Sequence, residues 1–373
     1  MSTVWVRCLA PTLVLACLPF ASGAEPVLVS GAVRDARQPQ AVVDTDGHVH
    51  VVFGSGDKIY YCRSDDGQEF GSPVPLATQG RLSLGMRRGP RVAVTDEAII
   101  VTAILGKQGM GRDGDLFTWR SSDGGISWSD PVQITDSAGA AREGLHGMAA
   151  DPSGHACCAW LDLRNGQTEI FTATSADHGA TWSENRLGYR SPNGSVCECC
   201  HPSVAIDQRG VVHLMWRNSL DGARDMYLAS SRDGGASFGK ARRVGAGSWM
   251  LDACPMDGGS LVTGAKGVLT TIWRREGQVF ATTGRDREQL LGSGEQPWAA
   301  SSQDGTYYVW ISGRPGELLL MRPDARQATR IADDALDPVI VAGGHDRDAV
   351  VVLWETGPRG EAKIMAQLVV RLD

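Results

Sequence analysis

The sequence predicts an all-β chain folded as a β-propeller of six or seven four-stranded blades, with seven preferred. Three observations support this prediction. The motif Ser-x-Asp-x-Gly-x-Ser/Thr-Trp/Phe occurs three times, short strand-like segments follow one another at even spacing, and the resulting unit recurs every ~40 to 58 residues. Repeated units of this length, rich in short strands, are typical of propeller blades.

The three complete copies of the motif are interpreted as tight hairpin turns. In each copy the aspartate carboxylate is expected to accept hydrogen bonds from turn N–H groups, while a glycine provides a positive φ angle. The terminal aromatic residue is expected to fill the space between adjacent sheets. We therefore predict a structural role, without substrate contact, for Asp123, Asp177 and Asp233. A degenerate fourth copy spans residues 64–70.

Each repeated unit starts with a short strand near a proline or methionine. The predicted unit starts are Pro39, Pro90, Met148, Pro202, Pro255, Pro297 and Pro338. The last unit contains only three strand-like segments. The segment Val27 to Ser30 is expected to supply its fourth strand and so to close the ring.

Residues 1–24 have the pattern of a signal peptide, with one early positive charge, an apolar stretch and then small residues. Cleavage after Ala24 fits best, and lipoprotein cleavage at Cys17 is the alternative. No later stretch approaches the ~20 apolar residues of a membrane helix. We therefore expect no transmembrane segment and a secreted or periplasmic location for residues 25–373, folded as one propeller domain.

The formal net charge of −7 and the absence of a basic run argue against a nucleic-acid partner. No cofactor is expected from the sequence, and the oligomeric state stays open. In a propeller, the loops before the innermost strands and those joining second to third strands lie on one face. This loop face is predicted to gather Glu143 with several arginines, and converging guanidinium groups favour a carboxylate or phosphate ligand.

Seven cysteines follow the signal segment, and an oxidising compartment favours pairing among them, with at least one left over. Soft ligands gather before two neighbouring innermost strands: Cys197, Cys199, Cys200, His201, Cys254 and Met256. A disulfide such as Cys200 to Cys254 is the preferred interpretation. A copper(I) or zinc site is the alternative, because sulfur and imidazole ligands suit these ions.

The motif copies and the blade pattern resemble the sialidase (neuraminidase) superfamily of BNR-repeat, or Asp-box, β-propellers. The resemblance extends over nearly the whole chain after residue 24. It implies that three arginines grip a sugar carboxylate: Arg37, Arg217 and Arg274. It further implies that Asp57 is the acid/base, by position alone, and that Glu198 activates a tyrosine nucleophile.

One departure from the family concerns this nucleophile. The segment Gln296-Pro297-Trp298-Ala299, where the tyrosine is expected, contains none, and Tyr189 is the remaining candidate. Three hypotheses follow. The first is a secreted exo-α-sialidase-like hydrolase acting on a sialic-acid-like or other acidic glycan. The second is a non-catalytic exported propeller that binds a glycan or a protein partner, and the third is a metal-binding propeller.

Overall fold

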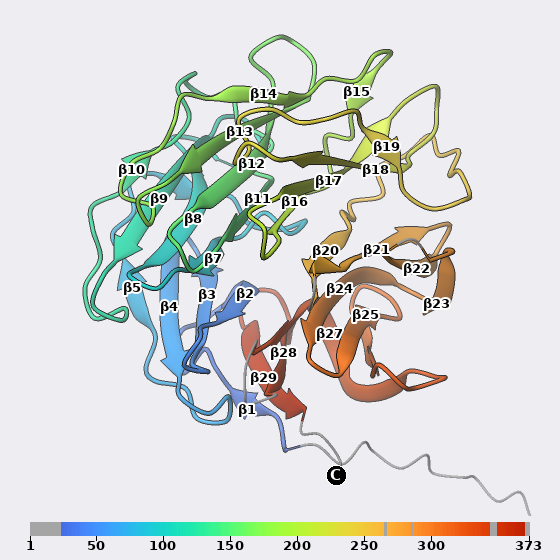
Figure 1. Cartoon of the computed structure of the whole chain (residues 1–373). Coiled ribbons are helices and arrows are strands. Elements are labelled where there is room, and N and C mark those ends of the chain that lie inside the picture. The colour runs from blue at the N-terminus through green and yellow to red at the C-terminus, as the bar shows by residue number, and fades with distance from the viewer. Residues whose placement is uncertain (1–23, 110, 265–266, 285, 344–348, 370–373) are drawn as a thin grey trace, which may run out of the picture.

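The computed structural model describes residues 24–109, 111–264, 267–284, 286–343 and 349–369. The described chain is all-β, built from short antiparallel strands without an α-helix (Figure 1). Consequently none of its described segments is a helix long and apolar enough to cross a bilayer. Residues 1–23 of the predicted signal peptide lie outside the described residues.

Five of the sheets are separate blades, three of four strands and two of five strands. The first contains β2 (Arg37–Val43), β3 (Val49–Ser55), β4 (Lys58–Ser64) and β5 (Val74–Leu76); the second β6 (Arg81–Leu82), β7 (Arg91–Val94), β8 (Ile99–Gly106), β9 (Asp115–Ser121) and β10 (Val132–Gln133); the third β11 (His146–Ala150), β12 (Ala156–Asp162), β13 (Glu169–Ser175) and β14 (Arg186–Tyr189); the fourth β15 (Ser195–Val196), β16 (Ser203–Ile206), β17 (Val212–Ser219), β18 (Met226–Ser231) and β19 (Arg242–Arg243); and the fifth β20 (Ser260–Thr263), β21 (Leu269–Arg275), β22 (Gln278–Thr283) and β23 (Gln289–Ser293). In the second and fourth sheets the innermost strand has two short parts, both paired with the same neighbour.

The sixth sheet has seven strands in the order β1-β29-β28-β27-β26-β25-β24. They are β1 (Val27–Leu28), β24 (Glu295–Ser302), β25 (Gly305–Ile311), β26 (Gly316–Met321), β27 (Thr329–Ala342), β28 (Val350–Thr356) and β29 (Lys363–Val369). The first half of β27 pairs with β26 and its second half with β28, so this long strand joins what the sequence predicted as two units. The structure therefore has five separate blades and one seven-stranded sheet, and the six or seven separate four-stranded blades that the sequence predicted are not found. β1 pairs with β29, as predicted for the N-terminal strand.

The innermost strands surround a central cavity of ≈ 410 Å³. They are β2, β7, β11, β16, β20, β24 and β27; each contacts the next, and β27 contacts β2. Tryptophans near the ends of second strands, including Trp160, Trp216, Trp273 and Trp310, are fully buried between sheets. Burial of one such side chain contributes about 2–3 kcal/mol. The fifth innermost strand starts at Ser260, later than the predicted Pro255, because residues 254–259 form an irregular segment on the loop face.

The repeated motif forms the expected kind of turn. Asp123 accepts hydrogen bonds from the Ser127 N–H (2.9 Å) and from the hydroxyls of Ser121 (2.7 Å) and Ser127 (2.5 Å). These bonds, led by that of the Ser127 hydroxyl, lower the pKa of Asp123 to about 2. Asp177 and Asp233 make equivalent bonds in their own turns.

Replacing Gly125 by alanine is expected to destabilise the protein by about 2–3 kcal/mol. Gly125 has a φ angle of 89°, and an added Cβ atom would lie 2.2 Å from Cε1 of the buried Tyr61 in the preceding blade. Gly124→Ala is the matched control, because Gly124 also has a positive φ (73°) but its nearest neighbouring atom, of Arg63, is 3.5 Å away. The measurement is urea denaturation of both variants. Equal losses of unfolding free energy in the two variants would show that the contact with Tyr61 does not contribute to the destabilisation.

Candidate functional site on the loop face

A buried polar network joins several blades at the loop-face end of the ring. The Arg87 guanidinium donates hydrogen bonds to the carbonyls of Gln296 (2.8 Å) and Pro338 (3.1 Å) and lies 3.8 Å from Asp337. Gln38 donates to Asp337 (3.3 Å) and accepts from the backbone of the segment that carries Arg87. These contacts connect the first two sheets to the seven-stranded sheet, so they fix the loops around the axis.

The three arginines predicted to grip a carboxylate have three different sets of partners. Arg37, whose side chain is 23% exposed, donates to Glu355 (3.2 Å), and Arg274, 20% exposed, donates to Glu295 (2.8 Å). Arg217 is only 1% exposed. Its N–H groups are directed at backbone carbonyls, those of Asp257, Arg224 and Arg274. Arg217 thus holds the loops together from within, and its guanidinium does not face solvent.

The other predicted catalytic residues come from three different sheets. Asp57 is exposed in the turn between β3 and β4. Tyr189 ends β14, packs against Trp216 with ring centroids 4.3 Å apart and the rings tilted by 41°, and accepts a hydrogen bond from Asn218 (3.2 Å). Burial raises the pKa of Tyr189, which keeps the phenol protonated, whereas an activated nucleophile needs the opposite shift. Glu198 is exposed in the loop before β16.

Glu143 is a further carboxylate on the loop face, close enough to Glu198 to feel its charge. The sequence offered no specific role for it. It lies in the loop before β11 with its side chain 17% exposed, and Arg142 lies 3.6 Å from its carboxylate. Arg88 donates to its backbone carbonyl (2.5 Å). Burial raises the pKa of Glu143; the charge of Glu198 raises it further, while Arg142 and Arg88 oppose the shift. No motif marks Glu143, and only its place before an innermost strand pointed to this face.

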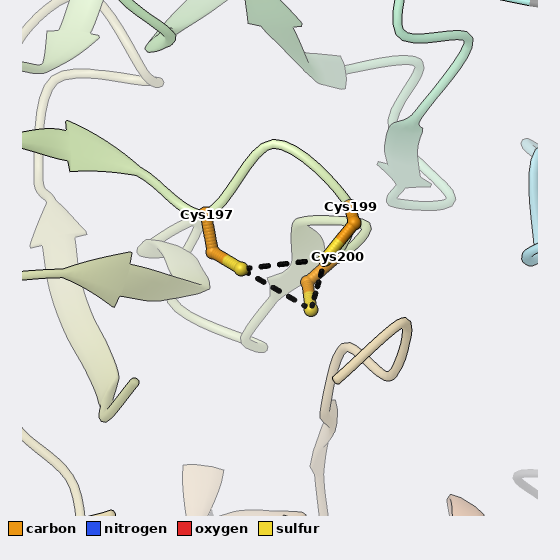
Figure 2. A group of neighbouring side chains, drawn as sticks. All are labelled: Cys197, Cys199 and Cys200. Carbon is orange, nitrogen blue, oxygen red and sulfur yellow. Dashed lines mark hydrogen bonds between the residues drawn. The ribbon is translucent and has the colours of Figure 1, made fainter. Parts of the chain in front are cut away.

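The cysteines before β16 form a compact sulfur cluster (Figure 2). The Sγ atoms of Cys197, Cys199 and Cys200 are 3.6, 3.7 and 3.9 Å apart, and all three residues are buried. All seven cysteines in the described part of the chain are free, so the preferred disulfide between Cys200 and Cys254 is not formed. Cys254 is exposed on the neighbouring loop.

The two other predicted soft ligands also lie outside this sulfur cluster. His201 is buried and stacks on Trp298, with ring centroids 5.8 Å apart. Met256 is exposed at the surface of the neighbouring loop. The structure therefore gathers three of the six residues that the sequence grouped together.

The chain was compared with known protein families and with solved structures. Residues 87–246 match the BNR repeat-like domain. Among curated protein sequences, none matches the chain.

Several solved structures share the fold. The GH93 α-L-arabinofuranosidase of Fusarium graminearum aligns with a TM-score of 0.58 and 12% identity, over 93% of this chain and 98% of that one. An inactive variant of virginiamycin B lyase from Staphylococcus aureus aligns with a TM-score of 0.56 and 11% identity, over 93% of this chain and 99% of that one. The Hadza microbial sialidase Hz136 aligns with a TM-score of 0.51 and 17% identity, over 90% of this chain and 65% of that one. The matched BNR repeat-like domain and the shared fold are consistent with a sialidase-like β-propeller.

Proposed function

We propose that the chain is an exported glycoside hydrolase-like propeller that cleaves a terminal acidic sugar at the loop face, with Glu143 as proton donor and Glu198 as second carboxylate. The carrying observation is the placement of these two carboxyl groups on neighbouring loops, one partly buried and the other exposed, with the charge of Glu198 acting on Glu143. Glycosidases use two carboxyl groups on either side of the scissile bond. Different surroundings give such a pair its separate acid and base roles.

The raised pKa of Glu143 supports this assignment, because a carboxyl group must keep its proton near neutral pH to protonate a leaving group. Arg142 is the favoured contact for a sugar carboxylate, since its side chain is 49% exposed beside Glu143. Arg37 and Arg274 remain candidates at the rim of the same face. Arg217 has no role in this proposal, because its donors are used within the protein.

We also infer that the ring contains seven blades. The inference is supported by the seven innermost strands around the cavity, and by the two four-stranded halves that share β27. Export is inferred from the sequence of residues 1–24 alone.

The test is the release of a fluorophore from a sialoside and from an α-L-arabinofuranoside by the wild type, Glu143→Gln and Glu198→Gln. We expect release from the acidic substrate, with both variants at least tenfold slower. Glu184→Gln is the matched control, because Glu184 is exposed beside the motif turn that follows β13, and it should keep the wild-type rate. Equal rates in all four proteins would contradict the role of Glu143 and Glu198.

The second candidate function is glycan binding without cleavage. It is favoured by the surroundings of Tyr189, whose hydroxyl is held by Asn218 and whose phenol stays protonated. In this case folded protein would release no fluorophore but would still bind the acidic sugar in a calorimetric titration. Arg142→Ala should then remove the binding.

A further inference from the structure

We propose that Cys197, Cys199 and Cys200 bind one Zn²⁺ ion through three thiolates on the loop face. Glu198, the second carboxylate of the proposed hydrolase, lies between two of these ligands, but the metal site is argued from the cysteines alone. The three residues open the innermost strand of the fourth sheet, where a tight loop turns their side chains toward a common point (Figure 2). Met86, from the second sheet, packs against the sulfur cluster.

The spacing of the sulfur atoms fits a metal ion better than a disulfide. A Zn–S bond is about 2.3 Å long, so two sulfurs of a tetrahedral zinc site lie about 3.8 Å apart. The three observed separations of 3.6, 3.7 and 3.9 Å bracket this value. A disulfide needs about 2.05 Å between two sulfurs and would leave the third cysteine alone. A nearly equilateral triangle is therefore the arrangement expected of three ligands to one ion.

Each sulfur also accepts a backbone N–H, as ligands of metal sites commonly do from surrounding groups. The Asp257 N–H donates to Cys200 (3.4 Å). The backbone of Met256 is hydrogen-bonded to Cys199, and that of Cys199 to Cys197. These hydrogen bonds hold the three sulfur atoms in a fixed orientation. A neutral thiol packed in an apolar core does not need such donors.

The positively charged side chains around the cluster also favour a metal site. The Arg224 guanidinium lies 3.8 Å from the Cys197 sulfur, and Arg217 and Arg88 interact electrostatically with the cluster. Three neutral thiols need no cations beside them, and burying guanidinium groups without anions is unfavourable. Zn²⁺ with three thiolates carries a net charge of −1, and the Arg224 guanidinium beside Cys197 favours this anionic form. Binding releases one proton to solvent from each thiol that was protonated.

Three protein ligands leave one position of a tetrahedral zinc ion open. The segment that carries the exposed Cys254 adjoins the cluster, as the Asp257 bond shows. The fourth ligand is therefore water or the Cys254 thiol, and the Cys254→Ser variant separates these two forms of the site.

The experiment measures metal binding to the full mature chain, purified with reductant and without oxygen. The probes are Zn²⁺, quantified by mass spectrometry, and Co²⁺, whose thiolate charge-transfer absorption reports sulfur ligands directly. We expect one ion per chain, and at least tenfold weaker binding in Cys197→Ser and in Cys200→Ser. Cys62→Ser is the matched control, because Cys62 is a buried cysteine far from the cluster in sequence, and it should bind as the wild type does.

Alkylation of the wild type keeps the proposal testable if a variant fails to fold. Bound Zn²⁺ should protect the three cluster cysteines, and a chelator should expose them together. A disulfide between two of them in chain isolated without added reductant, together with no Co²⁺ absorption after reduction, would overturn the proposal. Metal binding that persists in the Cys197→Ser variant would overturn it as well.

Discussion

Replacing Arg217 by alanine is expected to lower the free energy of unfolding by about 4 kcal/mol. The guanidinium is fully buried and donates to the carbonyls of Asp257, Arg224 and Arg274. Alanine leaves these acceptors without partners in a space that the side chain had filled. Each unpaired buried acceptor costs about 1–3 kcal/mol, partly recovered where water enters. Urea denaturation followed by tryptophan fluorescence measures the change.

Arg274→Ala is the matched control for this prediction. Arg274 lies near the end of the second strand of the next blade, but its side chain is 20% exposed and pairs with Glu295, which is 21% exposed. Its loss should cost only about 1 kcal/mol. If Arg217→Ala were as stable as the Arg274 variant, yet failed to bind an acidic sugar, Arg217 would be a substrate ligand, as the family resemblance implied.

The contrast between these arginines shows where the sequence was informative. The motif turns around Asp123 were predictable because every partner of the carboxylate lies within four residues of it. The strand order was predictable because alternating short strands and turns recur with one period, and the closing pair of β1 with β29 followed from the missing fourth strand.

The roles of individual loop residues were not predictable in this way. The carbonyls bound by Arg217 are 7, 40 and 57 residues away, and nothing local distinguishes a guanidinium directed at them from one directed at solvent. The cysteines before β16 were recognised as a cluster, but their spacing in sequence favoured a disulfide over a metal site. The separations of their sulfur atoms, which the sequence does not give, are the basis of the proposed zinc site.

Glu355→Gln is expected to raise stability at pH 8 and to leave it nearly unchanged near pH 4.5. Glu355 is almost fully buried at the end of β28 and accepts from Arg37 (3.2 Å) and from the Gln38 N–H (3.1 Å). Burial, followed by the charge of Asp337, raises the pKa of Glu355 to about 7, against the opposing effects of Arg37 and Gln38. An uncharged amide of the same shape avoids burying the charge.

The sign of the pH dependence follows from proton binding. Because the folded-state pKa lies above the ordinary value of 4.5, the folded protein holds more protons than the unfolded chain between about pH 4.5 and 7. Wild-type stability therefore falls across this window, by up to about 3 kcal/mol from this residue, and the loss persists above pH 7. Urea denaturation from pH 4.5 to 8 should show a smaller fall for Glu355→Gln. The exposed Glu361→Gln variant should follow the wild type, and a steeper fall for Glu355→Gln would mean that its pairing with Arg37 outweighs the burial of its charge.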